Sequence, residues 1–254
     1  MTIVAGVPVD WYRTSFAPNA GALYFEDGGE EVAQLAIQML ELDGSERVLD
    51  LACATGRRTL ELCREGFDVI GVDVCQGLLE VAGCEAEAED LLPWFYEEDP
   101  RYMRFEREFD VVLSLGGGAF EHFDSDEENL RAFEAAARAL RPGGRLLMQT
   151  PNVLYVEAHL ADRTWFQGGE TIELIEQHWN EPTRRLDGIR RTLVEFDTPQ
   201  DCDPVPFQRR IYTIEELAEI FESLGLHLAD VFDEDGRPWS PGDAERELYV
   251  EARC

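Results

Sequence analysis

The sequence predicts an α/β protein: a doubly wound, mostly parallel sheet of seven strands with an inserted antiparallel cap. Three observations support this prediction. Short apolar strands alternate with amphipathic helices, which is typical of parallel strands joined by right-handed crossovers. An apolar strand turns sharply into a helix at residues 48–56, and the next strand ends in Asp73. Residues 152–210 break the alternation with short β-like runs separated by turn residues.

Periodicity and capping signals place the individual elements. Apolar residues at helical spacing predict a helix over 28–42, at the end of an N-terminal lid and helix segment, 1–44. Ser125 and Thr213 each open a capping-box pattern, so a helix is expected after both. We expect the first of these helices to end at Pro142-Gly143. The strands expected in the core, which comprises 45–151 and 211–254, are 47–51, 68–73, 94–98, 109–115, 145–150, 226–232 and 246–252, the last two forming an edge hairpin.

The turn at residues 48–56, Val-Leu-Asp-Leu-Ala-Cys-Ala-Thr-Gly, is typical of a nucleotide-type cofactor site. Asp73 follows Asp50 by 73 − 50 = 23 positions. Roughly twenty positions separate a glycine-rich turn from a ribose-binding acid in nucleotide folds. The Asp73 carboxylate could therefore accept hydrogen bonds from ribose hydroxyls.

A nicotinamide dinucleotide site is the competing interpretation. Such a site needs G-x-G-x-x-G, so that the backbone can approach a pyrophosphate and the helix can pack closely. The three glycine positions are occupied here by Ala52, Ala54 and Arg57. An NAD-dependent oxidoreductase is therefore the less favoured alternative.

The turn resembles the D-x-G-x-G-x-G motif of the class I S-adenosylmethionine-dependent methyltransferases, with Asp50, Ala52, Ala54 and Gly56 in the four places. Residues 109–115 resemble the family's fourth strand, and residues 140–147 the entry to its fifth. The similarity covers about residues 10–150 well and 207–253 more loosely. It implies a Rossmann-like methyltransferase fold, S-adenosyl-L-methionine as cofactor, and methyl transfer to a nitrogen or oxygen atom of a small metabolite.

The resemblance also implies roles for individual residues. Asp50 would anchor the turn, the Ala52 carbonyl would face the cofactor's ammonium group, and Asp73 would hold the ribose. Asp99 would accept the adenine amino group. The full set of expected cofactor-binding residues is Tyr12, Asp50, Ala52, Gly56, Asp73, Asp99 and Leu115. Tyr12 belongs to an aromatic N-terminal segment that either covers the cofactor or packs on the domain.

Two positions depart from the family pattern. Ala54 carries a methyl group where close approach of the backbone favours glycine. Pro100 follows Asp99 and has no N–H to offer an adenine ring nitrogen. These departures keep open the alternative of a non-catalytic S-adenosylmethionine-binding protein.

His122 is the candidate catalytic residue. It lies in a glycine-rich loop after the fourth strand, at the mouth of the sheet. Imidazole titrates near neutral pH and could accept a proton from an amine or hydroxyl acceptor, and similar sugar N-methyltransferases carry a histidine in this loop. A packed, hydrogen-bonded histidine is the alternative interpretation.

The expected cap, 152–210, contains β-like runs at 171–178, 188–196 and 207–212. It follows the fifth strand, at the edge where ligands of open α/β sheets bind. We therefore expect it to bind the acceptor. His159, Trp165 and His178 are candidates for lining an acceptor pocket, or are ordinary residues of the cap.

Composition excludes several partners. The chain has 53 acidic residues and 22 basic residues, all of them Arg, for a net charge of −31. Such a surface repels phosphate backbones, so no nucleic-acid partner is expected. No apolar run reaches the length of a membrane helix. The six cysteines show no C-x-x-C spacing, so reduced thiols and no metal are expected. Residues 1–8 are apolar but show neither a basic leader nor a cleavage pattern, so a cytoplasmic location is expected.

Overall fold

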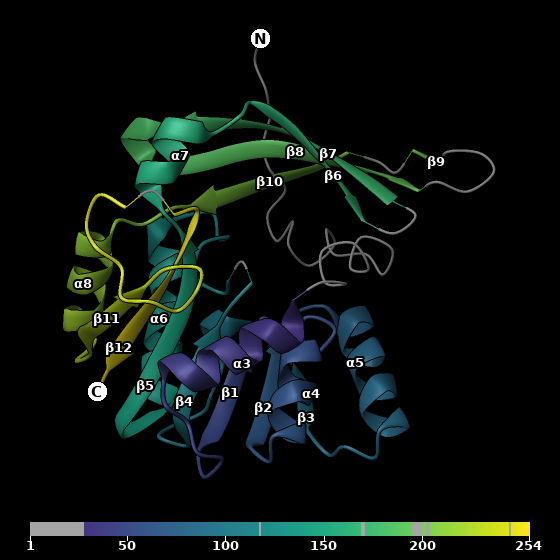
Figure 1. Ribbon diagram of the computed structural model, residues 1–254, viewed down its shortest axis with the longest axis vertical. Helices are drawn as coiled ribbons and strands as arrows, with labels where there is room; N and C mark the ends of the chain where they lie inside the picture. The colour runs from purple at the N-terminus through teal and green to yellow at the C-terminus, as the bar shows by residue number, and fades with distance from the viewer. Residues whose placement is uncertain (1–27, 117, 169–170, 195–199, 202–203, 244) are drawn as a thin grey trace.

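The computed structural model describes residues 28–254 apart from 117, 169–170, 195–199, 202–203 and 244 (Figure 1). Its larger sheet comprises β1 Arg47–Leu51, β2 Asp68–Asp73, β3 Trp94–Glu97, β4 Phe109–Ser114, β5 Leu140–Pro151, β11 His227–Phe232 and β12 Glu247–Arg253. The seven strands lie in the order β11-β12-β5-β4-β1-β2-β3. β1 to β5 pair in parallel, whereas β12 is antiparallel to both β5 and β11. The predicted doubly wound sheet with an edge hairpin is confirmed.

Helices cover both faces of this sheet. They are α3 Gly29–Met39, α4 Arg57–Arg64, α5 Gln76–Ala88, α6 Asp126–Ala139 and α8 Ile214–Ser223. α3 buries Ala36 in an apolar cluster with Val48 of β1, while α6 and α8 bury Phe133 and Phe221 on the opposite face. Successive residues of a strand point to opposite faces, so Val48 and its neighbour Leu49 belong to the two different clusters.

The two capping signals act as predicted. The Ser125 hydroxyl accepts the Glu128 N–H at 3.2 Å, and α6 begins there. Thr213 and Glu216 form a complete capping box at the start of α8. At the end of α6 the structure differs from the prediction, because β5 already begins at Leu140. The backbone of Leu140 pairs with Phe109, and Pro142-Gly143 lies in an irregular stretch of the strand instead of ending the helix.

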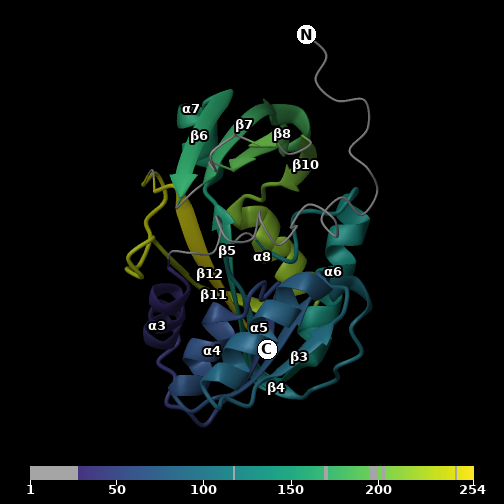
Figure 2. The same ribbon diagram turned by 90° about the vertical axis from the view of Figure 1, so that its right-hand side faces the viewer.

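A second, antiparallel sheet stands beyond one end of the first (Figures 1 and 2). It comprises β6 Arg163–Gly168, β7 Thr171–Asn180, β8 Arg185–Val194 and β10 Val205–Arg210, with the two-residue β9 Gln200–Asp201 beside β8. β7, β8 and β10 correspond to the three predicted runs. β6, β9 and the helix α7 Val153–His159 were not expected from the sequence. The Arg210 N–H donates to the Glu121 carbonyl at 2.7 Å, which joins this sheet to the loop after β4.

Strand order defines the place where a ligand can bind. From β1 the chain moves outward to β2 and β3, then returns to the other side of β1 for β4 and β5. Loops leaving β1 and β4 therefore diverge at the carboxyl edge. In open α/β sheets this switch point is where ligands bind.

Candidate cofactor and acceptor site

The turn between β1 and α4 has a left-handed backbone at three of its residues. Ala52, Ala54 and Gly56 have φ values of 55°, 52° and 76°. Only glycine adopts this conformation without a steric penalty, and a residue with a Cβ loses roughly 1–2 kcal/mol there. Two alanines thus hold the turn in a strained shape.

Gly56 is required for packing as well as for conformation. A Cβ on Gly56 would lie 2.8 Å from the Ala82 Cβ and 2.9 Å from the Phe95 ring. Ala82 belongs to α5 and Phe95 to β3, so the missing side chain lets both elements close onto the turn. The turn is therefore packed tightly against α5 and β3.

Asp73 ends β2 beside this turn. Its Oδ2 accepts the Ala54 N–H at 3.0 Å and its Oδ1 accepts the Cys75 N–H at 2.9 Å. Burial raises the pKa of the Asp73 carboxyl, backbone hydrogen bonds from Cys75, Ala54 and Val74 oppose that rise, and the nearby charge of Asp50 adds to it. A carboxylate offers about four acceptor positions. Asp73 thus orders the turn and retains capacity for a further donor.

Asp50 lies in β1, facing the start of α4. Its side chain is fully buried. Oδ1 accepts Arg58 Nε at 3.0 Å and Nη2 at 2.7 Å, while Oδ2 accepts the Thr59 hydroxyl at 2.7 Å. This carboxylate therefore binds the first turn of α4, and its place among the cofactor-binding residues stays a prediction.

Sequence reasoning did not identify Arg58. A signal was present, because an acid at the end of a buried strand needs a cationic or hydrogen-bonding partner. Arg58, eight positions later and only 9% exposed, is that partner. α4 carries Arg57, Arg58 and Arg64, and the angle between α4 and β1 determines which of them points inward. No local sequence pattern specifies that angle.

Asp99 lies two residues beyond β3 and is 7% exposed. Its Oδ1 accepts the backbone N–H and Nε of Arg101, both at 3.0 Å, and its Oδ2 accepts Arg101 Nη2 at 2.7 Å. Pro100 begins the short 3₁₀ helix η1 Pro100–Tyr102, where a missing N–H costs nothing. Arg101 therefore holds the Asp99 carboxylate in place at the candidate site. The sequence did not predict this ion pair.

The loop after β4 carries the candidate base. Leu115 is buried, and the N–H of the next residue, Gly116, donates to Gln149 Oε1 at 2.8 Å. His122 is half-buried, with Nδ1 3.4 Å from the Gln208 carbonyl oxygen of β10. His122 thus lies between the core and the antiparallel sheet.

Glu121, another residue that sequence reasoning missed, fixes the same loop. It is fully buried and accepts the Thr150 hydroxyl at 2.6 Å and Arg209 Nε at 2.5 Å. Thr150 belongs to β5 and Arg209 to β10, so this carboxylate joins the two sheets next to His122.

The structure does not bring all the other candidates to this edge. Tyr12, with the aromatic segment around it, lies outside the described residues. Trp165 is 63% exposed and its backbone pairs with Leu174, so it lies on the open face of the antiparallel sheet. His178 is exposed on that same face, and exposed His159 stacks on Tyr155. In the part of the chain that the structure describes these three residues are exposed, and a role in acceptor binding stays a prediction.

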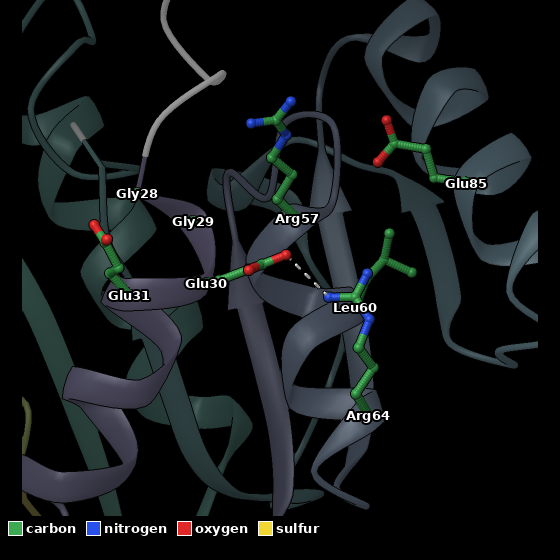
Figure 3. A pocket seen from close by; sticks show the side chains of 8 residues that line it. All are labelled: Gly28, Gly29, Glu30, Glu31, Arg57, Leu60, Arg64 and Glu85. Carbon is green, nitrogen blue, oxygen red and sulfur yellow. Dashed lines mark ion pairs between the residues drawn. The ribbon is translucent and has the colours of Figure 1, made fainter.

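A hollow of about 370 Å³ lies beside the turn, outside the starts of α3 and α4 (Figure 3). Arg57 and Arg64 of α4 face it together with Glu30 of α3 and Glu85 of α5. A Cβ on Gly29 would lie 2.8 Å from the Arg57 Cβ, so Arg57 packs against the start of α3. The carboxylates of Asp73 and Asp99 are not part of its lining. We therefore place the candidate site at the strand ends and not in this hollow.

Comparisons with known proteins point to one family. The methyltransferase-domain family matches residues 48–144. A putative methyltransferase of Bacillus subtilis, YqeM, is 25% identical over 209 residues, which cover 82% of this chain and 83% of that protein. Glycine N-methyltransferase of Rattus norvegicus is 31% identical over 168 residues, covering 59% of this chain and 56% of the rat protein. The chain spans 60% or less of the length of several other relatives that it matches.

Solved structures share the fold. An S-adenosylmethionine-dependent methyltransferase from Clostridium acetobutylicum gives a TM-score of 0.78 at 16% identity, with 94% of this chain and 98% of that chain covered. The amino pentose methyltransferase CalS10 from Micromonospora echinaspora, solved with S-adenosylmethionine bound, gives 0.65 at 19% identity over 99% and 100% of the two chains. Together, the family match, the relatives and the shared fold support a class I S-adenosylmethionine-dependent methyltransferase.

S-adenosyl-L-methionine is the cofactor of this family, and it has no pyrophosphate for Arg57 to obstruct. In the part of this methyltransferase that the structure describes, no group of three or more His, Cys, Asp or Glu residues could hold a metal ion. No helix in that same part is long and apolar enough to cross a bilayer.

Proposed function

We propose that this methyltransferase transfers the methyl group of S-adenosylmethionine to a nitrogen or oxygen atom of a small metabolite, with His122 as the general base. The arrangement of Asp73 and the left-handed turn at the switch point is the observation that carries the cofactor assignment. The relation to glycine N-methyltransferase and the likeness to an amino pentose methyltransferase support a small acceptor.

The chemistry of the donor groups fits the cofactor. Asp73 would accept a ribose hydroxyl, and the Asp99 carboxylate, held by Arg101, would face the adenine amino group. The Ala52 carbonyl, the Gly56 turn and the Leu115 backbone complete the described part of the site, and Tyr12 would cover it. Bound S-adenosylmethionine supplies a methyl group already activated by its sulfonium, so the protein's main task is alignment.

The role proposed for His122 is proton transfer. In the tautomer with the proton on Nδ1, that N–H donates to the Gln208 carbonyl oxygen and Nε2 carries the basic lone pair. Nε2 would accept the proton that an amine or hydroxyl acceptor loses as it is methylated. The half-buried ring lies next to β10, so the antiparallel sheet would hold the acceptor against it.

Cofactor binding is tested first, by calorimetric titration with S-adenosylmethionine, S-adenosylhomocysteine and NAD. We expect the first two to bind and NAD not to bind. Asp73→Ala should cost roughly 1.5–3 kcal/mol of binding free energy, the scale of hydrogen bonds to a charged group. Asp68→Ala is the control, since Asp68 opens the same strand and pairs with Arg47 at the other end of the sheet. Binding of NAD alone would contradict the proposal.

Catalysis is tested by methyl release against a panel of amines, amino acids and hydroxyl metabolites. With an acceptor in hand, His122→Gln should slow turnover by a factor of about 10²–10⁴ and leave the cofactor dissociation constant unchanged. His159→Gln is the matched control, because its Nδ1 also lies near a backbone carbonyl, that of Tyr155, at 3.3 Å. An unchanged rate in His122→Gln across pH 6–9 would remove the base assignment. No methyl transfer to any acceptor would instead favour a non-catalytic cofactor-binding protein.

A further inference from the structure

Arg101 joins two parts of the site that are separate in sequence. Its Nε and Nη2 bind the two oxygens of Asp99, as described above, and its Nη1 donates to Glu128 Oε2 of α6 at 2.7 Å. The guanidinium also lies over the Phe123 ring, 4.3 Å from the centroid. The Arg101 side chain is 11% exposed, so all these contacts are made largely out of water.

Phe123 is the residue directly after His122. Its N–H donates to Asn129 Oδ1 at 3.0 Å, and Asn129 Nδ2 donates in turn to the Tyr212 hydroxyl at 3.0 Å. All three residues are buried. The loop carrying His122 is therefore anchored at its end by α6 on one side and by the Arg101 guanidinium on the other.

We propose that Arg101 is a positioning residue that couples occupancy of the adenine end of the cofactor site to the orientation of His122. The inference rests on the proposed function, which assigns Asp99 to the cofactor and His122 to the acceptor. Arg101 touches neither ligand and acts through the two residues it holds.

The geometry makes the coupling direct. Arg101 holds both oxygens of Asp99, so a ligand that displaces this carboxylate also displaces the guanidinium. The Arg101 guanidinium is planar and rigid, so if it rotates with the Asp99 carboxylate, its plane also tilts relative to the Phe123 ring. Lysine keeps the positive charge but has no planar fork, and it cannot bind both Asp99 oxygens, Glu128 and the ring at once.

The structure supplies a matched control in Arg131. Its Nη1 binds the other oxygen of Glu128, Oε1, at 2.6 Å, so Arg131 shares a partner with Arg101. The contacts that hold Asp99 and the Phe123 ring come from Arg101 and do not involve Arg131. Loss of Arg131 therefore removes a charge next to Glu128 and leaves the link itself in place.

The test follows the His122 imidazole by NMR while S-adenosylhomocysteine is added, in the parent and in Arg101→Lys, Arg101→Met and Arg131→Met. The chain has four histidines, so the spectrum of His122→Gln assigns the signal. We expect a ligand-dependent shift in the parent and in Arg131→Met that is largely lost in both Arg101 variants. Arg101→Lys should also bind S-adenosylhomocysteine roughly tenfold more weakly, as fits the loss of a charged hydrogen bond.

An equal His122 shift in the Arg101 variants and the parent, at saturating ligand, would overturn the proposal, and so would no shift in the parent. Thermal melts identify variants that do not fold, and Arg101→Lys, which keeps the charge, carries the test if Arg101→Met is unfolded. The readout needs no turnover. Failure of the base assignment would appear in the His122→Gln rates, and failure of the coupling only in the Arg101 spectra.

Discussion

Three buried carboxylates at the strand ends are stabilised in different ways. Asp50 is neutralised by Arg58 and Asp99 by Arg101. Asp73 is held by backbone N–H groups, and burial raises its pKa. A carboxylate bound to a guanidinium is compensated by a full positive charge, whereas one held by neutral N–H groups is not. Asp73 therefore remains our proposed acceptor for the ribose hydroxyls.

Strain in the cofactor turn gives a prediction at a single residue. Ala54 has φ 52°, and Ala54→Gly removes a steric penalty of roughly 1–2 kcal/mol while adding roughly 0.5–1 kcal/mol of chain entropy to the unfolded state. We expect the free energy of unfolding to rise by about 0–1.5 kcal/mol. S-adenosylhomocysteine should bind as tightly or more tightly, because a methyl group leaves a turn that approaches the ligand. Urea unfolding and calorimetry measure the two effects.

Glu41→Gly is the control for this variant. Glu41 also has a left-handed φ, 49°, but it is exposed after α3 and away from the turn. It should gain stability without any change in ligand affinity. If Ala54→Gly folds normally yet binds ligand distinctly more weakly, the Ala54 methyl group makes a favourable contact and our account of this position is wrong.

At the scale of elements, Glu216 ties the cap sheet to the core. Its Oε1 accepts Arg184 Nη1 at 2.7 Å, beside β8, and Arg210 Nη2 at 2.6 Å, from β10, while Oε2 caps the start of α8. Burial alone would raise the pKa of Glu216, but the Thr213 N–H and the two arginines outweigh it, so the pKa lies below its usual range. The charged form is therefore favoured in the folded protein.

The sign of the pH dependence follows from that lowered pKa. A carboxylate whose pKa is depressed by folding contributes stability above its unfolded pKa, about 4.3, and loses it as the pH falls through the folded value. We expect Glu216→Gln to lower the free energy of unfolding by roughly 1–3 kcal/mol at pH 7. The difference from the parent should shrink below about pH 4. Exposed Glu219→Gln, on the same helix, should change little, and a pH-independent Glu216→Gln deficit would show that lost packing is the cause.

The elements that could be predicted from the sequence have signals that lie within one segment. The capping boxes at Ser125 and Thr213 and the apolar runs of the core strands depend on neighbouring residues, and they predicted both helix starts and the sheet. β6 was missed because its sequence, Arg-Thr-Trp-Phe-Gln-Gly, becomes a strand only by pairing with β7. Arg58, Arg101 and Glu121 were missed for a related reason: their partners come from other elements, and the inward-facing side chain depends on tertiary packing.

At the scale of the whole molecule, charge is the dominant property. Even if all 22 arginines were paired, 53 − 22 = 31 acidic residues would remain in excess. The ion pairs in the described part of the chain, such as Arg64 with Glu89 and Arg141 with Asp110, relieve local repulsion without changing that excess. Net charge of this size destabilises a compact state through self-repulsion.

We therefore expect potassium chloride to raise the melting temperature in the sub-molar range. The Debye length shrinks from about 10 Å at 0.1 M to about 3 Å at 1 M, which screens repulsion between surface acids. Screening also weakens the surface ion pairs, but exposed pairs contribute only about 0–1 kcal/mol each, so the repulsive excess should dominate.

The end of α5 provides a matched variant, because Glu87 and Asp90 lie there with no basic residue in the helix's last turn. Acids at a helix C-terminus oppose its dipole, so Glu87→Gln with Asp90→Asn should raise stability by roughly 0.3–1 kcal/mol per site at low salt and flatten the salt response. If the melting temperature of the parent stays constant or falls as potassium chloride is added, locally paired charges outweigh the net excess.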